Sequence, residues 1–349
     1  MTGSRNHSLT DLFAALDGRI EPMRDWAPLL QHSAETLTIG TLAARLSRSE
    51  HWDGLPGEVR ELLSDILDRT AKRNRSLEEQ ALELTRVLNG IGVEPIVMRG
   101  MARVLAGEFA EGRLISDIDL LLPIEKRDAA IDALRGLDYE IHQGFHGPPF
   151  SVVFGRNKDV GMVDVHTSLQ PYRLNVGYDR VAPLCDRKEI SGARLLLPNA
   201  TASVLLNVLH DQLHDGDYWR GLVDVRHMAE FPQFIEKGVD WTQLATFFPD
   251  RNARNALEVQ LRTAKRLVLA DIPEEYCGGT WARIQCARRL AQLRLPILMP
   301  LFTIATLAVD PPRKGPPSTH KRRTGSRLKF KFERALGSVN AGKAGGLSN

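Results

Sequence analysis

Short apolar segments typical of strands lie between residues 91 and 168, and long helical sequence encloses them on both sides. Residues 101–109 and 126–137 have the apolar spacing of helices, and they separate the first three of these segments from one another. An order of strand, helix, strand, helix and further strands predicts an α+β fold built on a small mixed sheet. The expected strands cover residues 92–98, 118–122, 139–142, 151–156 and 162–168, with turns at 144–149 and 157–161.

The flanking sequence is helical in pattern. Residues 8–92 carry apolar positions three and four apart, and the same spacing returns from Ala202 onward. A chain of 349 residues favours two or three domains. We expect an N-terminal helical region (1–90), a mixed-sheet core (91–200), a C-terminal helical domain (201–310) and a basic tail (311–349).

Two aspartates flank one apolar residue at the start of an expected strand. Asp117 and Asp119 should project from the same face, because side chains alternate across a strand. Their mutual repulsion is relieved by a divalent cation, and oxygen ligands suit Mg²⁺ or Mn²⁺. Such a pair holds metal in phosphoryl and nucleotidyl transfer, although surface loops also produce the pattern by chance.

A third acid strengthens this interpretation. Asp164 lies inside the apolar segment 162–166, where an unpaired carboxylate would cost several kcal/mol. If this strand neighbours the first, Asp164 completes a three-carboxylate site and could polarise an attacking hydroxyl. The competing hypothesis is a buried acid paired with a neighbouring basic residue.

A phosphate-binding element is expected at Arg99 and Gly100, where a strand gives way to a helix. Glycine permits close approach of the backbone, and a helix N-terminus offers free N–H groups to an anion. Arg113, four residues before Asp117, is either a phosphate contact or a solvated loop residue.

These motifs together resemble the bacterial uncharacterised nucleotidyltransferase family of the polymerase-β-like superfamily, over about residues 25–235. The resemblance implies a nucleotidyltransferase fold, Mg²⁺ dependence and an NTP donor, with metal bound by Asp117, Asp119 and Asp164. The resembling runs are residues 97–100, residues 113–121, which include Ser116 as a nucleotide-binding candidate, residues 163–166, and the later His210, His214, Trp219 and Asp224.

The chain departs from this family pattern at two positions. Met101 follows Gly100 where the superfamily commonly has a small residue that touches phosphate, and Arg99 stands where lysine is frequent. Arginine can hold phosphate bidentately, so the second change preserves the chemistry. The first change removes a hydroxyl or a small residue from the phosphate end.

Three histidines are candidates for the acceptor side of the site. His166 should share a strand face with Asp164, and a structural role is an equal alternative. His210 and His214 are one helical turn apart, a spacing compatible with zinc, but no second pair of ligands matches it. We therefore expect these two residues to form a polar helix face near the cleft.

The last 39 residues carry ten Lys and Arg against Glu333 alone, a net charge of +9 within a chain of net +3. This composition, rich in Pro, Gly and Ser, predicts disorder. The tail either has a solubilising or incidental role or makes weak contact with nucleic acid, acidic lipid or an acidic partner. The polar N-terminus lacks the apolar stretch of a signal peptide, and three cysteines form no paired framework. A cytoplasmic location follows, and the apolar run 295–309 is too short to span a bilayer.

The sequence therefore predicts a Mg²⁺-dependent transferase that uses an NTP, most readily ATP, and an acceptor hydroxyl. One alternative is a nucleotide-binding or interaction protein with this fold but without turnover, which Met101 favours and the three acids oppose. Another is a nucleic-acid-binding protein that acts through the tail, although the tail lacks interleaved aromatic residues for base stacking.

Overall fold

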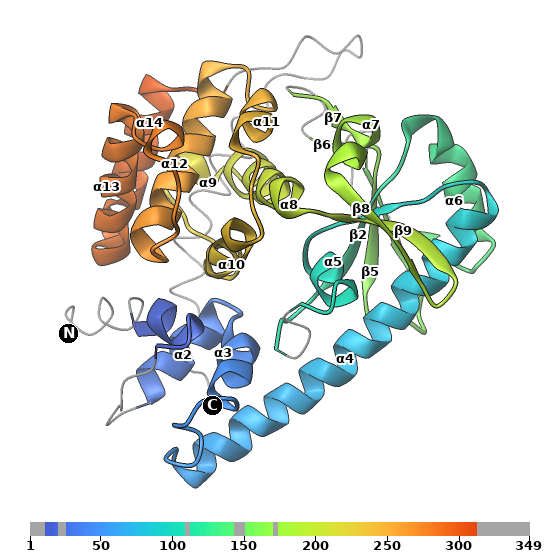
Figure 1. Ribbon diagram of the computed structural model, residues 1–349, viewed down its shortest axis with the longest axis horizontal. Coiled ribbons are helices and arrows are strands. Elements are labelled where there is room, and N and C mark those ends of the chain that lie inside the picture. The colour runs from blue at the N-terminus through green and yellow to red at the C-terminus, as the bar shows by residue number, and fades with distance from the viewer. Residues whose placement is uncertain (1–10, 20–25, 109–111, 143–150, 170–173, 313–349) are drawn as a thin grey trace, which may run out of the picture.

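A computed structural model describes residues 11–19, 26–108, 112–142, 151–169 and 174–312. It confirms the expected α+β fold, with a mixed sheet at one end and helices gathered at the other (Figure 1). The expected turn at 144–149 and the basic tail from residue 313 onward lie outside the described residues.

Seven strands form the main sheet. The neighbours β2 and β5 are parallel, as are β1 and β9, whereas every other pair is antiparallel. A second ladder pairs β6 (Ser168–Leu169) with β7 (Val176–Gly177). In sheet order the strands are β3 (Glu140–Ile141), β4 (Ser151–Gly155), β5 (Met162–His166), β2 (Asp117–Leu121), β1 (Ile96–Val97), β9 (Ala193–Pro198) and β8 (Cys185–Ile190).

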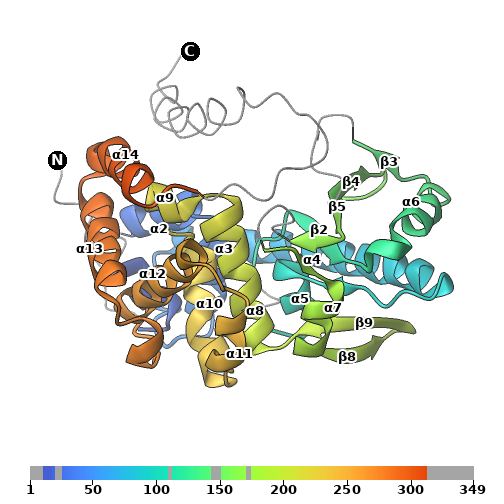
Figure 2. The same ribbon diagram turned by 90° about the horizontal axis from the view of Figure 1, so that it is seen from above.

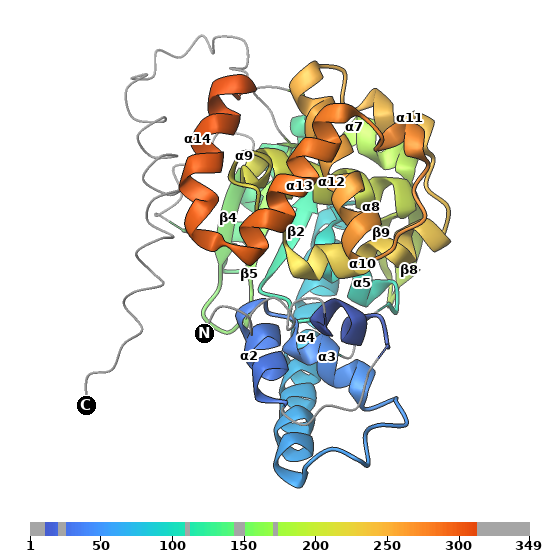
Figure 3. The ribbon, with the colours of Figure 1, turned by 90° about the vertical axis from the view of Figure 1, so that its left-hand side faces the viewer.

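A 34-residue helix connects the two ends of the molecule. Its second half packs on the sheet and α5, and its first half meets the N-terminal helices (Figures 1 and 3). The later part of the helical pattern expected over residues 8–92 is thus one helix. The elements are α2 (Ala27–Glu35), α3 (Ile39–Leu46), α4 (Gly57–Gly90), α5 (Arg99–Leu105), α6 (Arg127–Arg135) and α7 (Tyr178–Val181), with short 3₁₀ turns at Ile124–Lys126 and Ala182–Leu184.

The C-terminal half is helical, as its spacing predicts. Its first helix passes directly into a seven-residue π-helix, here called η3 (Val208–His214). The α-helices are α8 (Ala200–Asn207), α9 (Asp217–Arg220), α10 (Val225–Glu236), α11 (Trp241–Thr246), α12 (Arg251–Leu267), α13 (Thr280–Arg294) and α14 (Met299–Val309), with 3₁₀ turns at Glu274–Tyr276 and Pro296–Leu298.

Buried apolar side chains form two clusters. One fills the space between α4, α5 and the sheet, and includes Leu77, Val97 and Val163. The other is shared by the N-terminal and C-terminal helices, because Leu42 and Phe231 belong to the same cluster. None of the helices in the described residues is both long and apolar enough to cross a membrane.

The β8–β9 hairpin is absent from the expected strands. β8 is an edge strand whose central residues, Asp186 to Glu189, are charged and exposed, so it lacks the apolar alternation that identifies a strand. Charged residues on an edge discourage pairing with other chains. Ser191 and Gly192 at the turn both have positive φ, the conformation that a two-residue hairpin requires.

Candidate active site

The register between β2 and β5 places the three predicted acids together. Asp119 lies directly opposite Asp164, and Asp117 lies opposite Met162. Alternation then puts all three carboxylates on one face of the sheet. The other face is apolar, since Ile118 and Val163 are fully buried. The acids therefore line the side of the sheet that the core leaves open.

Asp119 is the most buried member of this group, with 2% of its surface exposed. Its Oδ1 accepts a hydrogen bond of 2.9 Å from Nη1 of Arg99 and lies 3.2 Å from Nε2 of His166. Burial alone would raise the pKa of Asp119, but Arg99 and His166 outweigh burial and lower it to about 2. Asp119 is thus held as a carboxylate.

Asp164 is partly buried beside this fixed negative charge. Burial, followed by the charge of Asp119, raises the pKa of Asp164 to about 6, although His166 acts in the opposite direction. Ligand atoms of Asp119, Asp164 and His166 all lie within 4.8 Å of one another. The folded chain therefore concentrates negative charge at one point, which a cation would relieve.

Arg99 reaches Asp119 from an unusual backbone conformation at the start of α5. Its φ of 52° lies in the left-handed region, which is uncommon for a residue with a β-carbon. The adjacent Gly100 is buried, and a β-carbon there would lie 2.7 Å from Nη1 of Arg113 and 3.2 Å from Cγ1 of Ile115. The Arg113 side chain packs so closely that it leaves no room for a β-carbon at position 100, and this alone explains the glycine there.

The structure places Arg113 in a buried ion pair. Its Nε lies 2.6 Å from Oε1 of Glu230 on α10, and both side chains are 8% exposed. Asn74 on α4 donates a 2.8 Å hydrogen bond to the Arg113 carbonyl. Arg113 is thus no solvated loop residue, and it ties the loop before β2 to two helices. Ser116, by contrast, is exposed and donates a 2.9 Å hydrogen bond to Oδ1 of Asp117.

Removing the guanidinium should destabilise the fold. We expect Arg113→Met to lower the free energy of unfolding by about 3–5 kcal/mol, because Glu230 would remain buried without its partner. Chemical denaturation measures this loss. In the control, Arg113→Met combined with Glu230→Leu should recover part of it. Unchanged stability with weakened Mg·ATP binding would instead make Arg113 a phosphate ligand.

His210 and His214 stack on each other in η3, with ring centroids 5.7 Å apart. Both histidines interact electrostatically with residues of the carboxylate site. The charge of His210 contributes to the low pKa of Asp119. Burial, followed by His210 and with smaller contributions from Arg99 and His166, lowers the pKa of His214 to about 4. The π-helix thus brings the predicted histidine face next to the acids.

His210 also belongs to a His–Asp–His cluster. It is the one member of this cluster that the sequence indicated as a site candidate. Oδ1 of Asp211 lies 3.0 Å from Nδ1 of His210 and 2.9 Å from Nδ1 of His227 on α10. Burial opposes the charged form of His227, but Asp211 outweighs burial, with additions from Asp224 and Glu230, and raises its pKa to about 8. His227 therefore carries a positive charge at neutral pH.

This pairing predicts a loss of stability in mild alkali. Because the pKa of His227 rises from 6.5 to about 8 on folding, its contribution is complete below pH 6.5 and disappears as the pH rises through about 8. The expected loss is about 2 kcal/mol, since each pKa unit corresponds to ~1.4 kcal/mol. Denaturation at a series of pH values measures it. His227→Gln should flatten this part of the profile, and an unchanged slope in the variant would assign it to other groups.

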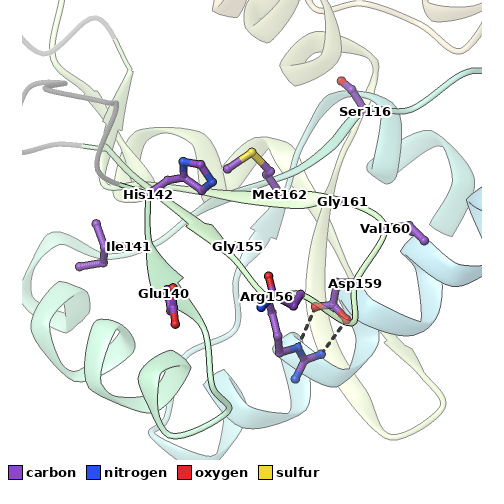
Figure 4. A pocket seen from close by; sticks show the side chains of 11 residues that line it. Ser116, Glu140, Ile141, His142, Gly155, Arg156, Asp159, Val160, Gly161 and Met162 are labelled. Carbon is purple, nitrogen blue, oxygen red and sulfur yellow. Dashed lines mark hydrogen bonds and ion pairs between the residues drawn. The ribbon is translucent and has the colours of Figure 1, made fainter.

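An open pocket of about 550 Å³ is lined by Ser116 and Met162, among other residues, but by none of the three acids (Figure 4). Arg156 and Asp159 also line it, and Nε of Arg156 donates a 2.8 Å hydrogen bond to Oδ2 of Asp159. This volume falls within the range of small-molecule sites. Ser116 precedes Asp117 in the sequence and Met162 is the strand partner of Asp117, so the pocket lies toward the Asp117 end of the acid face.

Comparisons with known proteins identify the family of the chain. A search of the curated proteins gave no match. Among solved structures, the antibiotic-resistance factor ANT(2'')-Ia is similar at 11% identity and a TM-score of 0.29, over 67% of this chain and 97% of that chain. At so low a TM-score, the family model alone carries the assignment. That model, described as uncharacterised nucleotidyltransferase, matches residues 22–268. The chain therefore belongs to this nucleotidyltransferase family.

Proposed function

We propose that the chain transfers a nucleoside monophosphate from an NTP, most readily ATP, to an acceptor hydroxyl and releases pyrophosphate. The observation that carries the proposal is the direct pairing of Asp119 with Asp164 across β2 and β5, with Asp117 on the same face. Membership of a nucleotidyltransferase family supports the reaction class.

The donor set fits a hard divalent cation. The carboxylates of Asp119 and Asp164 converge with the imidazole of His166, and Asp117 lies on the same face of the sheet. Oxygen ligands are those that Mg²⁺ and Mn²⁺ prefer. Asp117, Asp119 and Asp164 would hold the ion, with His166 beside it. When bound, it would neutralise charge on the triphosphate and lower the pKa of the acceptor hydroxyl. The 2.9 Å contact between Arg99 and Asp119 keeps the second carboxylate in position.

Asp164 is the proposed base for the acceptor hydroxyl. It extends from a different strand than Asp117 and Asp119, next to His166. As the acceptor oxygen bonds to the α-phosphorus, the bond from that phosphorus to the bridging oxygen of the leaving pyrophosphate breaks. The hydroxyl proton passes to the Asp164 carboxylate, which also polarises the attacking oxygen.

The phosphate end of the site is proposed at Arg99, Gly100 and Ser116. Arg99 is partly exposed beside Asp119, so its guanidinium can contact both the acid and an incoming phosphate. Ser116 is exposed at the mouth of the pocket. Arg113 supports this end from behind, because its guanidinium packs against Gly100 and is paired with Glu230.

Met101 bears on the alternative of a protein that binds nucleotide without turnover. Its side chain is fully buried in the cluster between α4, α5 and the sheet. Methionine here fills the core and offers no hydroxyl to a phosphate, so it still favours this alternative, which the three acids oppose. The nucleic-acid alternative depends on the tail, which lies outside the described residues.

The proposal is tested by following pyrophosphate release from ATP and Mg²⁺ in the presence of sugars, glycols, and serine- and tyrosine-containing peptides. We expect release that depends on both Mg²⁺ and an acceptor. Mass spectrometry should find the acceptor heavier by one nucleoside monophosphate. Tight binding of Mg·ATP with no release from any acceptor would favour the alternative without turnover.

A further inference from the structure

The last two helices of the described chain have an inverted distribution of polar and apolar side chains. In α14 the polar residues Thr303 and Thr306 are buried, whereas Leu301 and Ile304 are 64% and 53% exposed. Surface helices normally turn their apolar stripe toward the core. α14 therefore exposes an apolar face, whereas a helix that contacts only water on its outer side normally exposes a polar one.

Hydrogen bonds fix α14 in this orientation. Nε1 of Trp219 donates to the carbonyl of Asp310 over 2.8 Å, and Nδ2 of Asn255 donates to the Asp310 carboxylate over 2.9 Å. Arg288 of α13 donates to the Phe302 carbonyl over 3.3 Å and also to the Thr306 hydroxyl. The helix thus cannot rotate its apolar face inward without breaking these buried bonds.

The adjoining helix α13 shows the same inversion. Gln285, Arg288, Arg289 and Gln292 are buried, whereas Ile284 is 54% exposed. Nη1 of Arg289 donates to Gln260 and to Thr263, each over 3.1 Å. Polar networks hold both helices from the inside and leave aliphatic side chains outside.

These aliphatic side chains form a patch. Six of the twelve large exposed apolar residues in the described part of the chain lie in this short segment, at the end of the molecule opposite α6 (Figures 1 and 2). Ile297 is the most exposed of them at 85%, and its spacing to Leu301 and Ile304 follows one helical face. We call this set the α13–α14 patch: Ile284, Leu295, Ile297, Leu301, Ile304 and Val309.

The charge of the following sequence indicates what covers the patch. Arg313 and Lys314 come directly after Pro312, and residues 311–349 have a net charge of +9. Two copies of the chain meeting at this face would bring two such segments together, which like-charge repulsion opposes. A bilayer with anionic lipids satisfies both features, because its interface accepts aliphatic side chains and its headgroups attract Lys and Arg.

We propose that the α13–α14 patch docks the protein on an anionic lipid surface, which the net charge of +9 in residues 311–349 favours. Neither α14, at 11 residues, nor any other described helix spans the bilayer. α14 lies along the interface, with Ile297, Leu301 and Ile304 directed into it. The carboxylate face belongs to the sheet and remains outside the docking surface.

Vesicle sedimentation of the full chain tests this proposal. We expect binding to vesicles of phosphatidylcholine mixed with phosphatidylglycerol, weaker binding at higher salt, and little binding to phosphatidylcholine alone. Ile297→Gln, Leu301→Gln and Ile304→Gln together should weaken partitioning by about tenfold or more, as should deletion of residues 313–349. The melting temperature of each variant should match that of the unaltered chain.

A matched control is Leu37→Gln, Ile124→Gln and Leu269→Gln, which removes three exposed apolar side chains of similar size outside the patch. This control should bind like the unaltered chain. Equal binding by the patch variant would overturn the proposal, as would equal affinity for the two vesicle types. Dimerisation that the patch variant abolishes, without vesicle binding, would assign the face to a second copy. Stronger vesicle binding after deletion of residues 313–349 would indicate that the chain's own tail covers the α13–α14 patch, and would overturn the proposal.

Discussion

Asp164→Asn should lower product formation by roughly 10²-fold or more while leaving Mg·NTP affinity within about tenfold. Asp117 and Asp119 still hold the metal of the nucleotide in this variant. The amide keeps the shape of the carboxylate but cannot accept the proton of the incoming hydroxyl. Calorimetry with Mg²⁺ and ATP gives the affinity, and pyrophosphate release gives the turnover.

The melting temperature of the same Asp164→Asn sample tests whether Asp164 has a purely structural role. Among the described residues, Asp164 is partly exposed and forms no ion pair with Arg or Lys, so the melting temperature should change little. Asp186→Asn is a suitable control, since this exposed acid lies on β8 at the far edge of the same sheet. A large fall in melting temperature, or undiminished pyrophosphate release, would contradict the assignment of Asp164 as the base for the acceptor.

Asp119→Asn should abolish Mg²⁺-dependent binding of NTP. Asp119 is buried, and Arg99 and His166 hold its carboxylate ionised. Asparagine retains an oxygen for Arg99 but lacks the charge that attracts a hard cation. We expect a folded protein whose affinity for ATP no longer depends on Mg²⁺, measured by calorimetry with and without the metal. Asp117→Asn should behave alike.

Wild-type affinity of the Asp119→Asn variant for Mg·ATP would contradict the metal assignment. A parallel measurement on Asp186→Asn separates a specific effect from a general change of charge, because that variant also loses one carboxylate from the sheet. Its Mg·ATP affinity should equal that of the unaltered chain.

Local periodicity predicted the strands that carry the acids but not which strands are neighbours. Strand alternation predicted that Asp117 and Asp119 share a face, and the apolar run around Asp164 predicted a second strand, whose pairing with the first was only a condition of the three-carboxylate site. The structure shows these strands as parallel neighbours in register. Whether these acids bind metal stays a prediction that the proposed variants test.

The supporting contacts could not be predicted, because they join residues that are far apart in the sequence. Arg113 and Glu230 are 117 positions apart, and neither residue's local sequence indicates the other. Asp211 meets His227 only because η3 is wound as a π-helix before α10 folds back. Helical periodicity assumes an α-helix, so it gives the wrong rotation for side chains in this segment.

The three carboxylates are proposed to form one divalent-metal site that organises an NTP. Electron paramagnetic resonance of Mn²⁺, titrated with the chain and a non-hydrolysable ATP analogue, tests this site. We expect the free Mn²⁺ signal to fall on addition of the chain and to fall further with the analogue. Asp117→Asn, Asp119→Asn and Asp164→Asn combined should remove both effects, while Asp186→Asn should retain them. Equal loss of Mn²⁺ signal with the triple variant and the unaltered chain would contradict the account.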